Sequence, residues 1–193
     1  HSMGVFLLLK RYNASLEEQI AGLIHDVSHS AFSHIIEYVL DTGKEKDQSH
    51  QDDIHEEYVM NSEIPGILKK YKIDPNFILD DKNFPLKENK IPDLCADRID
   101  YFLRNSLIFG EVDNDFHKRA LKNLIVKDNK WVFKNIGIAH EYANLFLKMN
   151  RKHYSGSNAV VMYKVMADLL RYALEKGYIK KHDLYKTDSH VWN

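Results

Sequence analysis

The chain contains a single cysteine, Cys95, and no long apolar run. One cysteine excludes an intramolecular disulfide and suits a reducing compartment, so we expect a cytoplasmic protein. No apolar stretch approaches the roughly 18 residues of a transmembrane helix. No signal-peptide pattern is visible either. The sequence therefore gives no reason to expect a membrane partner.

An excess of positive charge is also missing. The chain has 27 Lys and Arg against 28 Asp and Glu, which gives a formal net charge of -1. A near-neutral protein has no global field that would attract nucleic acid or an anionic membrane surface. A local positive pocket remains compatible with this composition. The composition therefore carries no strong signal of a nucleic-acid partner.

The size and composition are those of one globular domain. At 193 residues, with 44% hydrophobic and 28% charged residues, the chain can bury a core of its own. We therefore predict a single domain over residues 1–193. Because it opens within an apolar helical run without Met and stops where another helix begins, we expect an excerpt truncated at both ends. The segments outside it would then carry any contacts of a homo-oligomer.

Apolar periodicity predicts a mostly helical fold. Ser15 and Glu18 form a capping-box pattern, in which Glu18 would reach back to the N-cap of a helix that ends near His25. A polar stretch at 41–53 predicts a mobile loop, and Pro92 is expected in the first turn of a helix that runs to Leu107. The remaining helices are predicted at 1–12, 35–40, 54–61, 113–124, 136–153 and 157–176, the last ended by Gly177.

Residues 124–126 and 131–133 are rich in branched and aromatic side chains and flank a polar turn at 127–130. This pattern is typical of a β-hairpin, and it is the only convincing strand signal in the chain. The predicted fold class is all-α, a helical bundle with one small two-stranded hairpin insertion.

Three segments carry the residues of a metal site. The first is His25-Asp26, followed by His29 and by Phe32-Ser33-His34; the second is the stretch 93–102, with Asp97; the third is the opening His1-Ser2-Met3-Gly4-Val5. Imidazole and carboxylate are suitable ligands for a divalent cation with an open hydrolytic position. Adjacent residues on a regular helix point about 100° apart, so His25 and Asp26 can share one ion only beyond a helix end.

These segments resemble the HD superfamily of metal-dependent phosphohydrolases, and within it the branch of deoxynucleoside triphosphate triphosphohydrolases. That branch carries His-Ser-x-Gly-Val, His-Asp-x-Gly-His-x-Pro-Phe-Ser-His and Asp-x-x-Asp-Tyr-x-x-Arg-Asp, matched here over about residues 1–110. The resemblance implies an HD-domain bundle and one divalent metal ion (Mn, Fe, Zn, Ni or Mg). The implied metal ligands are His1, His25, Asp26 and Asp97.

Two alternatives stay open in this ligand set. His1 lies in a His-Ser-Met start that could be a cloning remnant, although Gly4-Val5 continues the family pattern. Asp100 competes with Asp97 for the fourth position. We favour Asp97 because the family ligand precedes Asp-Tyr by three residues, and we expect Asp100 to pair with a basic side chain.

The resemblance also implies a set of catalytic residues. His29 would contact phosphate or transfer a proton, and His55 would be a second catalytic histidine. Glu37 corresponds to an acidic residue that orients that second histidine in the family. Such a carboxylate fixes the tautomer of the imidazole and raises its basicity.

The resemblance also implies substrate contacts by residues that follow Asp97 in the chain. Arg98 would bind phosphate, Tyr101 would touch phosphate and sugar, and Asn105 replaces an aspartate that reads the sugar 3′-hydroxyl. Ser28, Ser30 and Ala31 also depart from the usual Gly, Gly and Pro of the family. Three further substrate contacts are candidates, each with a structural alternative. His34 could be a hydrogen-bonded helix histidine, and Arg151 and His153 could belong to a cationic helix end.

The predicted function is the metal-dependent hydrolysis of a nucleotide phosphoester or phosphoanhydride. Its most specific form is the release of triphosphate from a deoxynucleoside triphosphate, although Asn105 leaves the choice of sugar unassigned. One alternative is a phosphatase or phosphodiesterase that acts on nucleoside monophosphates or other small phosphate esters. Another is a non-catalytic module that binds a nucleotide.

Overall fold

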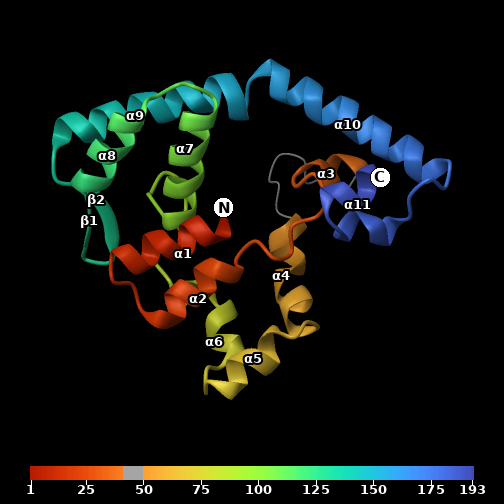
Figure 1. The fold of residues 1–193 in the computed structure, drawn as a ribbon, viewed down its shortest axis with the longest axis horizontal. Helices are drawn as coiled ribbons and strands as arrows, with labels where there is room; N and C mark the ends of the chain where they lie inside the picture. The colour runs from red at the N-terminus through yellow and green to blue at the C-terminus, as the bar shows by residue number, and fades with distance from the viewer. Residues whose placement is uncertain (41–49) are drawn as a thin grey trace. The chain divides into compact units, whose positions relative to one another are not determined.

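The structure is a computed structural model that describes residues 1–40 and 50–193, apart from the side chain of Asn114 (Figure 1). Its first helices are α1 (Ser2–Arg11), α2 (Leu16–Ile24), α3 (Ile35–Leu40), α4 (His50–Met60), α5 (Ile64–Lys70), α6 (Pro75–Leu79) and the short 3-10 helix η1 (Asp81–Asn83). Then follow α7 (Ala96–Ile108), α8 (Asn114–Asn123), β1 (Leu124–Lys127), β2 (Lys130–Phe133) and α9 (Ile136–Met149). The π-helical turn η2 (Asn150–Tyr154), α10 (Ser157–Glu175), η3 (Lys181–Tyr185) and α11 (Asp188–Trp192) complete the chain.

The chain forms two compact units. The first consists of residues 1–25 and 65–154, and the second of residues 26–64 and 155–193. Each has an apolar core of its own. The expectation of a single domain over the whole chain stays a prediction.

In the first unit, α1 lies against both α2 and α7 (Figure 1). Val5 and Leu9 of α1 are fully buried and face Gly22 of α2, where an added Cβ would lie 2.5 Å from Leu9 Cδ1. The two helices can approach this closely because position 22 has no side chain. Ile99 and Phe102 of α7 join the same core.

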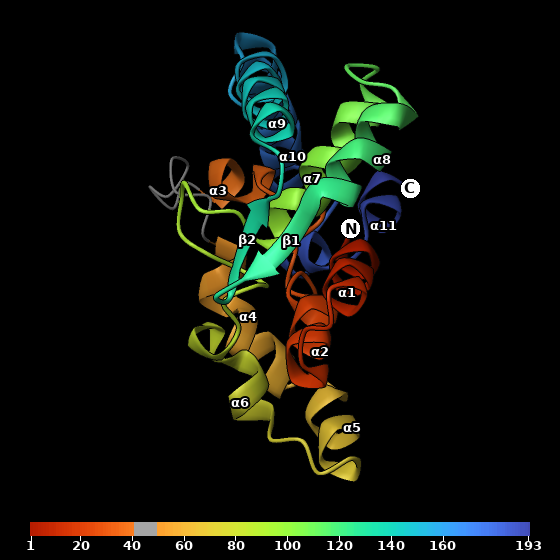
Figure 2. The same cartoon turned by 90° about the vertical axis from the view of Figure 1, so that its left-hand side faces the viewer.

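The hairpin belongs to the first unit as well (Figure 2). Its strands pair antiparallel with Leu124 opposite Phe133 and Lys127 opposite Lys130. Trp131 is buried and donates its indole N–H to the carbonyl of Leu86 at 2.9 Å. The hairpin therefore holds the segment that leads into α7.

In the second unit, α3 packs against α10. Ile35, Ile36 and Val39 supply one side of its core, and Ala167 and Leu170 supply the other. Arg171 of α10 donates hydrogen bonds to the carbonyls at the end of α3. These contacts hold the end of α3 against α10.

The predicted fold class is confirmed: over residues 1–40 and 50–193 the structure is helical with one two-stranded hairpin. Gly177 follows the last residues of α10 with φ of 73°, as expected for the position after a helix. No helix within residues 1–40 and 50–193 is long and apolar enough to cross a membrane.

Three local predictions were wrong. Residues 50–53, expected in a loop, are the first turn of α4, while 41–49 lie outside the described residues. Pro92 precedes α7, whose N-cap is Cys95, because the Cys95 side chain accepts from the N–H of Arg98. Ser15 does cap α2, accepting from Glu18 N at 3.1 Å, but the Glu18 carboxylate turns into the core and does not complete the capping box.

Candidate metal centre

His25 lies immediately beyond the last residue of α2. Its Nδ1 contacts the carbonyl oxygen of Gly22 at 2.8 Å. A carbonyl can only accept, so Nδ1 carries a proton, and Nε2 is the nitrogen that can bind an ion once it is deprotonated. At the end of α2, His25 therefore faces Asp97 with its Nε2.

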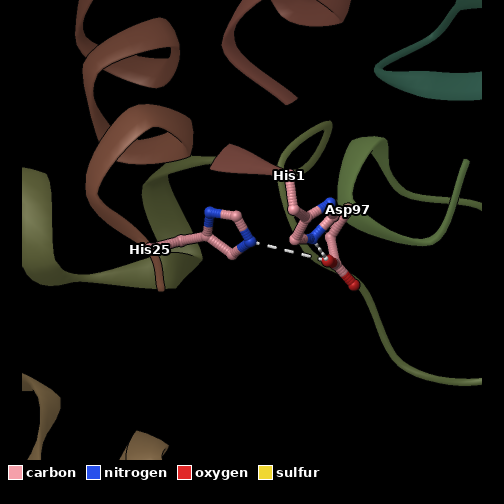
Figure 3. Close-up of side chains that lie close together, drawn as sticks. All are labelled: His1, His25 and Asp97. Carbon is pink, nitrogen blue, oxygen red and sulfur yellow. Dashed lines mark hydrogen bonds and ion pairs between the residues drawn. The ribbon is translucent and has the colours of Figure 1, made fainter. Parts of the chain in front are cut away.

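His1 and Asp97 meet His25 at one point (Figure 3). His1 Nε2 lies 2.7 Å from Asp97 Oδ1, and His25 Nε2 lies 3.5 Å from the same oxygen. Ligand atoms of the three side chains lie within 4.8 Å of one another. Three separate segments, the start of α1, the end of α2 and the first turn of α7, supply them.

A chain of hydrogen bonds places Asp97. Glu18 accepts from the N–H groups of Leu86 at 2.7 Å and Lys87 at 2.9 Å. The carbonyls of the same two residues then accept from Ala96 N at 2.8 Å and Asp97 N at 3.3 Å. The first turn of α7 is thus linked to α2, the helix that ends just before His25.

Asp97 is held in its ionised form. Burial alone would raise the pKa of this carboxyl, but hydrogen bonds to His1 and His25 outweigh burial and hold its pKa well below the usual range. An ionised carboxylate beside two Nε2 atoms is a donor set that suits a divalent transition ion. By the chemistry of their donors, these residues fit a metal ion.

A second group of potential ligands, Glu88, Cys95 and Asp97, does not fit as well. Burial raises the pKa of the Cys95 thiol to about 12. Arg98 Nη1 lies 3.3 Å from Cys95 Sγ and so places a cation where the ion would have to bind. A protonated thiol next to a guanidinium is a poor metal ligand.

The second unit contains Asp26, His29 and His34. His29 Nε2 lies 3.3 Å from Asp26 Oδ1, and the rings of His29 and His34 meet edge to face at 5.3 Å. His29 Nδ1 is buried and has no hydrogen-bond partner among the described residues. An imidazole with one nitrogen next to a carboxylate is suited to proton transfer.

His55 and Glu37 lie in the same unit. His55 Nδ1 is 3.0 Å from the hydroxyl oxygen of Ser28, which follows His25 by three residues in the chain. Glu37 is fully buried, and its Oε1 accepts from the backbone N–H of His50, the first residue of the helix that carries His55. The orienting role predicted for Glu37 stays a prediction.

Arg98 is turned toward the segment before α7. Its guanidinium donates to the carbonyls of Asp93 and Asn89, the latter at 3.3 Å, and lies 3.7 Å from Glu88 Oε1. Only 13% of the side chain is exposed. These contacts hold the loop next to Asp97.

Tyr101 lies beside His1, one of the candidate metal ligands. Its ring is 6.4 Å from the ring of His1 and 5.6 Å from that of Tyr154, both edge to face. Burial raises the pKa of the Tyr101 hydroxyl, so it stays a neutral donor. Burial raises the pKa of Tyr154, and the nearby Asn105 side chain partly opposes the rise. Tyr101 and Asn105 therefore border the same aromatic group.

Arg151 and His153 lie in η2, the distorted turn after α9. Arg151 is exposed and lines a surface groove with Lys148 and Lys152. His153 stacks on Phe109 at 4.3 Å, and its Nε2 lies 2.9 Å from Glu111 Oε1. Their predicted contacts with substrate stay predictions.

Sequence reasoning missed the contact of Asp100 with His1 and the carboxylate of Glu111. Asp100 was expected to pair with a basic side chain, and Arg104 does bind it, but Asp100 also contacts His1. Glu111, 5% exposed, binds Lys148, Lys152 and His153 at once. The i, i+4 spacing of Asp100 and Arg104 could have indicated their pair. No local pattern indicates the contacts of Glu111, because its partners lie far along the chain.

Two known proteins are similar to this chain over its whole length. YdhJ of Bacillus subtilis, an uncharacterized protein, is 36% identical over 100% of this chain and 59% of its own length. Metal-dependent phosphohydrolase cns2 of Cordyceps militaris is 29% identical over 100% of this chain and 57% of its own. The chain thus spans less than two thirds of these relatives.

Solved structures show the same fold. A hypothetical protein from Aquifex aeolicus superposes with a TM-score of 0.67 at 22% identity, over 100% of this chain and 56% of that one. A phosphohydrolase from Bacteroides thetaiotaomicron also gives 0.67, at 20% identity, over 100% of this chain and 53% of that one. The family model described as HD domain matches residues 1–105, which include His1, His25 and Asp97. This chain therefore belongs to the HD domain family.

Proposed function

We propose that this protein is a metal-dependent phosphohydrolase that acts on a phosphoester or phosphoanhydride of a nucleotide. The observation that carries the proposal is the convergence of His1 Nε2 and His25 Nε2 on Asp97 Oδ1. The name of the Cordyceps militaris relative, metal-dependent phosphohydrolase, agrees with it. Asp26, which follows His25 in the chain, completes the proposed ligand set.

A divalent ion bound there would stabilise charge on phosphoryl oxygens and make water more acidic. The chain itself supplies the ligands and the proton carriers. His29, next to Asp26, can accept or donate a proton at Nε2, and His55 is the second proton carrier in the proposal. Glu37 is proposed to orient His55.

The finer substrate proposal is a deoxynucleoside triphosphate, from which triphosphate would be released. It rests on the motif resemblance, including Arg98, Tyr101 and Asn105. The remaining proposed substrate contacts are His34, Arg151 and His153. A nucleoside monophosphate or another small phosphate ester is the second candidate, because Arg98 is already engaged by the loop before α7.

The test uses the metal-stripped chain, reloaded separately with Mn²⁺, Fe²⁺, Zn²⁺, Ni²⁺ or Mg²⁺. Each form is incubated with deoxynucleoside triphosphates, nucleoside triphosphates and nucleoside monophosphates, and the products are separated by chromatography. We expect turnover with at least one metal and none for Asp97→Ala. Metal binding without turnover of any substrate would favour the non-catalytic nucleotide-binding module. Turnover that survives Asp97→Ala would overturn the proposed centre.

A further inference from the structure

We propose that Asp100 is a positioning residue that selects the metal-binding nitrogen of His1, and that Arg104 holds Asp100 in place for this task. The inference rests on the proposed metal centre. It assigns a role to two residues that do not themselves reach the ion.

The imidazole of His1 lies between two carboxylates of the same helix. Nε2 is 2.7 Å from Asp97 Oδ1, and Nδ1 is 2.7 Å from Asp100 Oδ2. Positions 97 and 100 are three apart on α7 and so share one face of the helix. A single helix, α7, therefore contacts both nitrogens of the His1 ring and orients it.

One neutral imidazole cannot donate to both carboxylates, because it has one donor and one acceptor. When an ion is bound, Asp100 can take the Nδ1–H, which leaves the Nε2 lone pair for the ion in place of the proton that Nε2 shares with Asp97 here. His25 shows the same arrangement, with Nδ1 on the carbonyl of Gly22 and Nε2 toward Asp97. Such a partner on the remote nitrogen fixes the tautomer and orientation of a metal-binding histidine.

Arg104 fixes the direction of the Asp100 carboxylate. Its Nη2 lies 3.0 Å from both Asp100 oxygens, and its Nε lies 3.2 Å from Oδ2. The Asp100 side chain is 13% exposed, whereas that of Arg104 is 43% exposed. The guanidinium thus closes the solvent side of the carboxylate, which can then face His1.

Gly4 makes this arrangement sterically feasible. A Cβ at position 4 would lie 2.0 Å from Asp100 Oδ1 and 2.3 Å from Arg104 Nη2. Any side chain there would push the Asp100–Arg104 pair away from α1, the helix that begins next to His1. The close approach of α1 and α7 at Gly4 brings the imidazole within reach of Asp100.

The test compares Asp100→Asn, Asp100→Ala and Arg104→Lys by Mn²⁺ affinity in isothermal titration calorimetry. We expect Asp100→Ala to weaken binding about 10–100-fold, the usual effect of losing such a partner. Asp100→Asn keeps an acceptor and should lose less, and Arg104→Lys should lose least. Glu141→Gln breaks an exposed pair with Arg119 in the same unit and serves as the control, with unchanged affinity.

A second measurement is independent of metal and of activity. Long-range ¹H–¹⁵N NMR of the metal-free protein reports the tautomer of His1 directly. We expect a proton on Nδ1 in the wild type and the form protonated only at Nε2 in Asp100→Ala, where Asp97 is the remaining acceptor, with unchanged thermal unfolding in Asp100→Asn as the check on folding. Unchanged affinity and tautomer in Asp100→Ala would overturn the positioning role. Unchanged affinity in Asp97→Ala would instead overturn the proposed metal centre.

Discussion

Glu18 and Leu86 lie far apart in the sequence, yet the Glu18 carboxylate accepts the backbone N–H of Leu86 at 2.7 Å inside the core of the first unit. The same carboxylate accepts from Lys87 at 2.9 Å. Burial raises the pKa of Glu18, while these two hydrogen bonds partly oppose the rise. A buried carboxylate that serves two backbone donors is part of the scaffold beneath Asp97.

The first prediction concerns this contact. Glu18→Ala should lower the free energy of unfolding by about 1–3 kcal/mol for each buried N–H left without an acceptor. Glu18→Gln keeps an acceptor and should cost less. Urea unfolding monitored by circular dichroism measures both. Glu17→Ala changes the neighbouring carboxylate and should have an effect within about 0.5 kcal/mol. Equal losses for Glu17→Ala and Glu18→Ala would contradict the role of Glu18.

The helices and the hairpin could be predicted from the sequence because their signals are local. Apolar spacing and turn residues fall within single segments, as at the Lys127–Lys130 turn. The start of α7 was misplaced because Pro92 is only a local cue, and the helix start is set by contacts of Ala96 with Leu86. The capping box failed for a similar reason, since a tertiary contact engages Glu18.

The convergence of three candidate metal ligands could be predicted because residue types and motif spacing can be read from the sequence alone. His1, His25 and Asp97 are near one another in the structure, as the motifs predicted. The contact of His1 with Asp100 could not be predicted from the sequence, because it depends on how closely α1 approaches α7 at Gly4. A pattern gives residue types, but packing decides which oxygen meets which nitrogen.

The second prediction concerns Arg98. Arg98→Ala removes the donor that holds the carbonyls of Asn89 and Asp93, and should lower the free energy of unfolding by about 1.5–3 kcal/mol. Arg98→Lys should recover only part of the loss, because one ammonium cannot replace the planar fork. Urea unfolding measures both variants.

Steady-state kinetics of Arg98→Ala test the predicted phosphate contact separately. A contact with substrate phosphates should lower kcat/KM more for a triphosphate than for a monophosphate. A pure loop role would lower both alike. If neither stability nor kinetics changed, both assignments of Arg98 would be wrong.

The third prediction is a pH dependence at Glu111. Hydrogen bonds to Lys148, Lys152 and His153 hold the pKa of this carboxyl well below its usual range. A depressed carboxyl pKa contributes stability above the unfolded value of about 4.3, and the contribution is lost as pH falls below it. Wild type should therefore be more stable than Glu111→Gln at pH 7, and the difference should shrink toward pH 3.

Melting temperatures of both proteins between pH 3 and pH 7 decide this point. Asp168→Asn is the matched control, because Asp168 lies in an exposed cluster with Lys164 and Arg171. Exposed pairs contribute little, so this variant should differ little from the wild type over the whole range. A gap between wild type and Glu111→Gln that stays constant down to pH 3 would rule out the linkage.

The last prediction uses two helical glycines that differ only in their surroundings. A Cβ at position 22 would lie 2.5 Å from Leu9 Cδ1 and 3.1 Å from Val5 Cγ1, both in buried residues, whereas nothing lies within 4 Å of a Cβ at position 66. Gly22→Ala should therefore cost about 1–3 kcal/mol through overpacking, more than the gain in helix propensity. Gly66→Ala in α5 should be neutral or stabilise by up to about 1 kcal/mol.

The sign of the difference tests the packing of α1 on α2. Urea unfolding measures both variants, and the double variant Gly22→Ala with Leu9→Ala isolates the clash. Leu9→Ala removes the atom that the new Cβ of Gly22→Ala would clash with, and that Cβ fills part of the space that Leu9→Ala leaves. The double variant should therefore lose less stability than the sum of the single losses. Additive losses would mean that Leu9 does not face Gly22. Since Gly22 also supplies the carbonyl that fixes His25, Gly22→Ala should weaken Mn²⁺ binding too, whereas Gly66→Ala should not.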